Sequence, residues 1–99
     1  MFQLSDQLVL AVYRLTGGFP KSELFGLTSQ MRRAAASIPV NLAEGAARTG
    51  AKEFAQFVNI AIGSCEEVRC QIHLAGALGY VAKADQEKLD GQYEVVKKC

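Results

Sequence analysis

Hydrophobic residues recur along this chain with the period of an α-helix in four separate segments. Residues 4–15 carry apolar side chains at positions i, i+4, i+7, i+8 and i+11, which share one side of a helix. The same kind of spacing predicts helices over about residues 28–48, 51–78 and 84–98. Glycine or proline separates each segment from the next. We therefore expect one domain, residues 1–99, with an all-α fold: an antiparallel up-down-up-down four-helix bundle.

The second of these helices carries its polar side chains in a single stripe. At 100° per residue the stripe covers an arc of roughly 80°. Its members are Gln30, Arg33, Ser37, Asn41, Glu44 and Arg48. Because the stripe keeps its phase across Pro39, we expect one helix that is kinked at the proline rather than two helices. Thr28 or Ser29 is expected to cap its start.

Apolar residues lie on both sides of this stripe. One side, with Met31, Ile38 and Leu42, suits the core of the chain itself. The other side consists of Ala36, Val40, Ala43 and Ala47. A lone bundle would leave this second flank in water, so we expect a further copy of the chain to cover it.

Two interpretations of the stripe remain open. It can be the ordinary exposed strip of an amphipathic helix. Alternatively, it forms a half-buried network with neighbouring copies or with Gln56, Asn59, Glu66 and Glu67 of the third helix. The members of that network would be Gln30, Arg33, Ser37, Asn41 and Glu44. The two apolar flanks favour the network.

Charge is distributed unevenly along the chain. The 99 residues have a formal net charge of only +1. Between residues 29 and 52, however, Glu44 is the one acidic residue among cations, whereas residues 85–94 are mainly acidic. Such clusters can be solvated faces, but a cationic one can also hold phosphates. The candidate nucleic-acid-binding residues are therefore Arg32, Arg33, Arg48 and Lys52.

Residues that could support catalysis or bind a metal are sparse. His73 is the single histidine, and Glu66 and Glu67 are adjacent and face different directions. The glycine-rich fingerprints of dinucleotide-binding loops and of P-loops are both absent from the sequence. We expect no enzyme, no catalytic residue and no cofactor.

The cysteines lack CxxC spacing, so no metal site is expected, and Cys65 is expected to be buried. No apolar run approaches the roughly 20 residues of a membrane span, and no basic signal-peptide region precedes the first helix. We expect a soluble cytoplasmic protein with no membrane partner.

Several strings of residues resemble a known protein family. They are Phe19-Pro20, the run from Glu23 to Ala34, Ser37-Ile38-Pro39, Asn41-Leu42-Ala43-Glu44-Gly45 and the run from Ile60 to Ser64. From about Leu4 to Tyr80 the chain resembles the four-helix-bundle family that includes proteins encoded in intervening sequences of bacterial 23S ribosomal RNA genes. The accessory variability proteins of diversity-generating retroelements have the same kind of fold.

This resemblance implies an assembly of five subunits in a ring, that is, a homopentamer. The family motif falls on residues that look like fold and assembly residues, not catalytic ones: Gln30, Arg33, Ser37, Pro39, Asn41, Glu44 and Gly45. The retroelement relatives use a basic ring surface to engage nucleic acid and a reverse transcriptase. RNA, DNA and a reverse transcriptase are thus implied partners, although the net charge of +1 is lower than in strongly basic relatives.

Two functions follow from the sequence. The first is a non-enzymatic oligomeric bundle that associates with RNA or a ribonucleoprotein through Arg32, Arg33, Arg48 and Lys52. The alternative is a protein-interaction scaffold, for example a reverse-transcriptase accessory protein, that does not contact nucleic acid directly.

Overall fold

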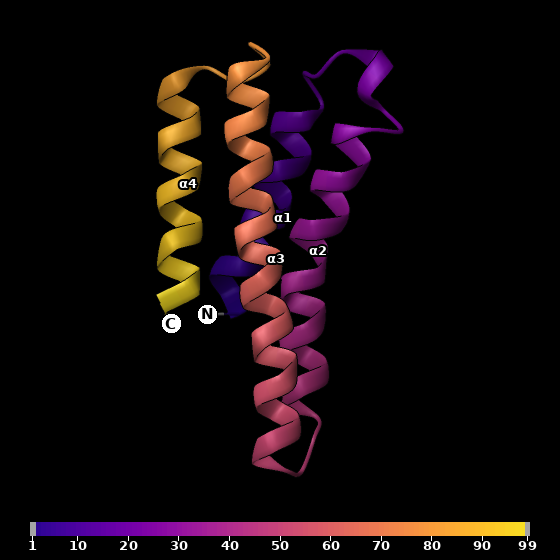
Figure 1. The fold of residues 1–99 in the computed structure, drawn as a ribbon, viewed down its shortest axis with the longest axis vertical. Coiled ribbons are helices and arrows are strands. Elements are labelled where there is room, and N and C mark those ends of the chain that lie inside the picture. The colour runs from indigo at the N-terminus through magenta and orange to yellow at the C-terminus, as the bar shows by residue number, and fades with distance from the viewer. Residues whose placement is uncertain (1, 99) are drawn as a thin grey trace.

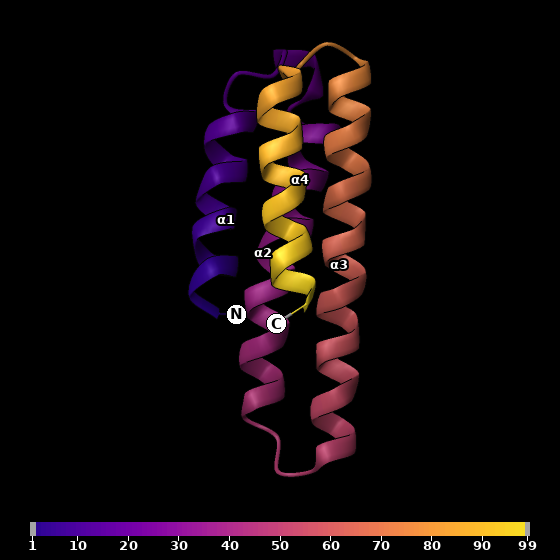
Figure 2. The same cartoon turned by 90° about the vertical axis from the view of Figure 1, so that its left-hand side faces the viewer.

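The computed structural model describes residues 2–98, and the side chains of residues 3–98. It contains α1 (Phe2–Thr16), a short 3₁₀ helix η1 (Lys21–Glu23), α2 (Leu27–Ala46), α3 (Ala51–Ala77) and α4 (Lys83–Lys98). Successive α-helices run in opposite directions and lie side by side (Figures 1 and 2). Throughout residues 2–98 the fold is all-α, as the periodicity predicted. The four predicted helices agree with the observed bounds to within about two residues.

Pro39 lies inside α2 without dividing it, so the expectation of one helix instead of two is confirmed. A kink at this proline stays a prediction. The predicted cap is wrong, because α2 begins at Leu27 and no side chain of Thr28 or Ser29 caps it. The amide of Leu27 instead donates to Glu23 Oε1 at 3.4 Å.

Glu23 thereby connects two turns at the same end of the bundle. Its other carboxylate oxygen accepts a hydrogen bond of 3.0 Å from the hydroxyl of Tyr80, in the turn between α3 and α4. This hydrogen bond to a carboxylate raises the pKa of Tyr80. The ring of Tyr80 also packs on Phe19, with 5.3 Å between ring centroids. The start of α2 is thus held by Glu23, which bonds both the nearby Leu27 amide and the distant Tyr80 hydroxyl.

The core lies where all four helices overlap. Buried side chains from each helix form one cluster, which includes Val12, Ile38, Ile72 and Tyr93. Tyr93 is the largest of the fully buried side chains, and Cys65 is 1% exposed, as predicted. Burial of these apolar surfaces is the main source of folding free energy in a domain of this size.

Beyond this core, α2 and α3 continue as a two-helix hairpin (Figure 1). Lys97, in the last turn of α4, reaches Glu66 in the middle of α3 at 2.9 Å, so α4 ends near that level. We call residues 40–60 the projecting hairpin. Phe54 and Ile60 are 45% and 52% exposed there. Phe54 has the helical spacing of the α3 core residues, but it is exposed because α1 and α4 do not extend far enough to cover it.

The buried thiol of Cys65 predicts a loss of stability at alkaline pH. Burial, aided by the Glu66 carboxylate, raises its pKa from 9.0 to about 11. The folded state therefore holds this proton more tightly, and the contribution is complete below about pH 9 and lost towards about pH 11. We expect the free energy of unfolding to fall by up to about 2–3 kcal/mol over this range because of Cys65.

Urea unfolding at several alkaline pH values checks this expectation. A Cys65→Ala variant should show a smaller fall over the same range than the unmodified protein. Burial and the neighbouring Cys65 also raise the pKa of Tyr93, so the difference between the two proteins measures Cys65 together with its effect on Tyr93. Equal pH dependence in the two proteins would contradict a buried, protonated Cys65.

Candidate nucleic-acid interface

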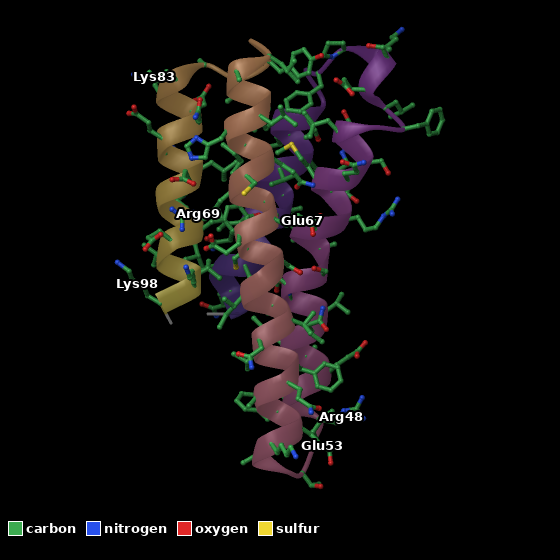
Figure 3. All side chains as sticks on the ribbon, viewed as in Figure 1. Arg48, Glu53, Glu67, Arg69, Lys83 and Lys98 are labelled. Carbon is green, nitrogen blue, oxygen red and sulfur yellow. The ribbon has the colours of Figure 1, made fainter. Side chains whose placement is uncertain are left out.

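The four candidate cations lie in two places on the structure. Arg32 and Arg33 are in the second turn of α2, whereas Arg48 follows the end of α2 and Lys52 is in the first turn of α3. Figure 3 shows Arg48 at the end of the projecting hairpin. Arg48 comes fifteen residues after Arg33, which corresponds to about 20 Å along a helix axis. A single copy therefore does not bring the four cations together.

Arg32 has a structural role that the sequence did not reveal. Its Nε donates to Thr16 Oγ1 at 2.9 Å, and its Nη2 donates to the Tyr13 carbonyl at 3.4 Å. Its guanidinium carbon also lies 4.6 Å from the centroid of the Tyr13 ring. These partners are at the C-terminal end of α1, where the helix dipole favours a cation. Arg32 thus ties α2 to α1 and has fewer donors left for a phosphate.

The other three cations are exposed and have no carboxylate partner within the part of the chain that the structure describes. Arg33 donates to Ser29 Oγ at 3.3 Å, and the Arg48 guanidinium lies 4.8 Å from the centroid of the Phe57 ring. Among the described side chains, every ion pair is made within or between α3 and α4. Arg33, Arg48 and Lys52 therefore present unneutralised positive charge to solvent.

Two acidic residues of α4, Asp90 and Glu94, instead form ion pairs with α3. Arg69 Nε contacts Asp90 Oδ1 at 2.9 Å, and its Nη1 contacts Glu94 and Glu66. Figure 3 shows Arg69 between the two helices. Its hydrogen bond with Asp90 raises the pKa of Arg69, and the hydrogen bond from Lys97 lowers the pKa of Glu66. The surface around α2 is consequently more basic than the net charge of +1 indicates.

Among the described residues, one hydrogen bond links the polar stripe of α2 to α3. Ser37 Oγ donates to Ser64 Oγ at 2.5 Å, while Asn41 Nδ2 donates back to the Ser37 carbonyl at 2.7 Å. Gln30 and Glu44 are exposed. Within one chain the stripe is thus mainly a surface strip, and bonds from Gln30 and Glu44 to neighbouring copies stay a prediction.

The second apolar flank of α2 is largely uncovered in a single chain. Val40 is 52% exposed, Ala43 and Ala47 are exposed, and Ala36 is half-buried. Leu10 on the neighbouring helix α1 is 56% exposed as well. The structure therefore places apolar side chains in water where the sequence predicted a second apolar face. Coverage of that face by another copy stays a prediction.

A hollow of about 480 Å³ beside Arg32 and Arg33 was missed by sequence reasoning. We call it the aromatic hollow; it is lined by Tyr13, Leu24, Phe25, Thr28, Ser29, Arg32, Arg33 and Ala36. The fold brings Tyr13 of α1 and Phe25 of the η1–α2 turn to these two cations, although neither ring is close to them in the sequence. The one available signal was the pair Leu24-Phe25, two apolar residues in a turn that should face solvent.

Two classes of site have no support in residues 2–98. None of the described helices has the length and apolar character needed to cross a bilayer. The described His, Cys, Asp and Glu side chains likewise form no group of three that could hold a metal ion.

Comparison with known proteins gives a clear result. The model of the family described as 23S rRNA-intervening sequence protein matches residues 1–99. A solved structure of a protein of unknown function from the S23 ribosomal protein family of Bacteroides thetaiotaomicron VPI-5482 superposes with a TM-score of 0.90 at 18% identity. The match covers 98% of this chain and 88% of that one, so the two share a fold. No curated protein matches the chain.

Proposed function

Because the chain belongs to the 23S rRNA-intervening sequence protein family, we propose that it is a non-enzymatic homo-oligomer that associates with RNA or a ribonucleoprotein in the cytoplasm. The observation that carries this proposal is the unneutralised positive charge of Arg33, Arg48 and Lys52, which take no part in the ion pairs within and between α3 and α4. Cations of this kind bind the phosphate backbone without regard to base sequence.

Assembly would raise the affinity for RNA, because each copy adds the same weak phosphate-binding site. One copy offers few phosphate contacts and a net charge of +1, so its affinity alone is low. Further copies that cover Val40 and Ala43 would repeat the cations around a ring, and simultaneous contacts would raise the overall affinity. A ring of five copies is the expected form.

Salt dependence tests the proposal. We expect the protein to bind structured RNA at about 50 mM salt and to lose most of this affinity at about 200 mM. An Arg48→Gln/Lys52→Gln variant should bind more weakly and with a shallower salt slope, because each lost phosphate contact removes roughly 0.7–0.9 from it. Lys83→Gln/Lys88→Gln removes the same charge from α4 and should have little effect. Absence of binding at low salt, or affinity that salt does not change, would overturn RNA association.

A protein-interaction scaffold is the second candidate. The exposed apolar side chains of Leu10, Val40 and Ile60, together with the low net charge, favour it. A reverse transcriptase is the partner that such a scaffold would serve. This function predicts an oligomer that assembles normally and shows no affinity for RNA or DNA at any salt concentration.

A further inference from the structure

The most exposed large hydrophobic side chain on the described surface is Phe25. It is 93% exposed, in the turn between η1 and α2, and the core does not include it. Leu24 beside it is 50% exposed. A phenylalanine ring that stays in water contributes little to folding, whereas its burial against a partner contributes substantial binding energy. The ring is therefore better placed to bind something than to stabilise this chain.

Phe25 shares the aromatic hollow with a second ring and with two cations. Tyr13 is 46% exposed, and the Arg32 guanidinium lies 4.6 Å from its ring centroid. Arg33 is exposed at the hollow and is hydrogen-bonded to Ser29, which also lines it. The hollow thus combines flat apolar surfaces with donors for an anion.

The charge around the hollow favours an anionic occupant. Its eight lining residues include Arg32 and Arg33 and no carboxylate. Glu23, the nearest acidic residue in the sequence, is engaged by Tyr80 and by the amide of Leu27 and does not line the hollow. An apolar face of another protein chain would bury the two guanidinium groups without a counter-charge, which is costly.

We propose that the aromatic hollow binds an unpaired base and the adjoining phosphate of a single-stranded RNA. This inference rests on the proposed RNA association and specifies which kind of RNA segment is bound. The volume of about 480 Å³ lies within the range of sites that hold small ligands. Phe25 provides the face on which the base stacks, Tyr13 borders it, and Arg33 contacts the phosphate.

An unpaired segment is required because of how a duplex presents its bases. In an A-form helix the base faces are stacked on each other, and the deep major groove excludes side chains. A ring on a surface turn can stack only on a base that is splayed out of a loop, bulge or end. The hollow should therefore discriminate single strands from duplexes, which Arg48 and Lys52 alone would not do.

Binding of a labelled oligouridylate and of a duplex RNA, each at one fixed salt concentration, tests the proposal. Phe25→Ala should weaken binding of the single strand roughly 5- to 100-fold and leave duplex binding unchanged. Phe25→Tyr keeps the flat ring and should bind as the unmodified protein does, whereas Phe25→Leu keeps only apolar bulk and should behave like Phe25→Ala. Leu74→Ala removes an apolar side chain of α3 that is 52% exposed and does not line the hollow, and it serves as the control.

Three results would overturn the stacking site. They are an unchanged single-strand affinity in Phe25→Ala, an equal loss for single strand and duplex, and a fall in assembly mass, which would make the hollow a contact between copies. If the unmodified protein still binds RNA with salt dependence in these cases, RNA association survives without the site. If it binds neither RNA, both proposals fail together.

Discussion

Replacing Gly45 with alanine is expected to lower the free energy of unfolding by up to about 2 kcal/mol. Gly45 is buried where α2 packs on α3, and a Cβ at this position would lie 2.9 Å from Phe57 Cβ and 3.4 Å from Phe54 Cδ1. The Cβ of Phe57 is fixed to its backbone and cannot rotate away, so the two helices would have to separate. This overpacking outweighs the roughly 1 kcal/mol that alanine gains over glycine in a helix.

Two other glycines provide matched controls for this substitution. Gly63 in α3 and Gly91 in α4 are exposed helical positions where an added Cβ meets no heavy atom within 4 Å. Gly63→Ala and Gly91→Ala are therefore expected to raise stability by roughly 0.5–1 kcal/mol. Urea unfolding at one fixed protein concentration compares the variants, since the stability of an oligomer depends on concentration. A stabilising Gly45→Ala would contradict the close approach of α2 and α3.

Introducing a charge at Val40 is expected to reduce the assembly to single chains. In Val40→Glu, each contact between copies would bury a carboxylate without a partner, which costs several kcal/mol per interface. Val40 is 52% exposed in one chain, so the substitution leaves the core of the bundle unchanged. Light scattering should report a lower mass, while circular dichroism should report the same helical content.

Val95 on α4 provides the matched control for this second variant. It is 51% exposed, so Val95→Glu adds the same charge in place of the same side chain at the same degree of exposure. This variant should keep the mass of the unmodified protein. If both variants keep it, Val40 is not at a contact between copies; if both lose it, the effect is not specific to the second flank of α2.

Local sequence patterns predicted the helices well, because the start, end and apolar face of a helix depend mainly on residues that are close in the sequence. Apolar spacing and the breaks at Gly17, Gly50 and Gly79 fixed the segments to within a few residues. The cap of α2 could not be predicted in this way, since Glu23 takes that role through the fold of the η1 turn. Phe54 is exposed although it shares the spacing of the α3 core residues, because periodicity identifies one face of a helix but not how far the neighbouring helices cover it.

The candidate site was predictable only in part. The charge distribution named Arg33, Arg48 and Lys52 as candidates, and all three are exposed on the structure. Arg32 looked equivalent to Arg33 in the sequence, but its contacts with Thr16 and Tyr13 come from α1 and depend on how the two helices pack. The aromatic hollow was missed for the same reason, because three separate elements contribute its lining.

The mass of the unmodified protein in solution, measured by multi-angle light scattering, tests most directly whether other copies cover the second apolar flank of α2. One chain has a mass of 10.7 kDa, and we expect a single species of five times that mass. A species with the mass of one chain, at every concentration measured, would contradict assembly through Val40 and Ala43 and would leave RNA binding without the repeated surface on which it depends.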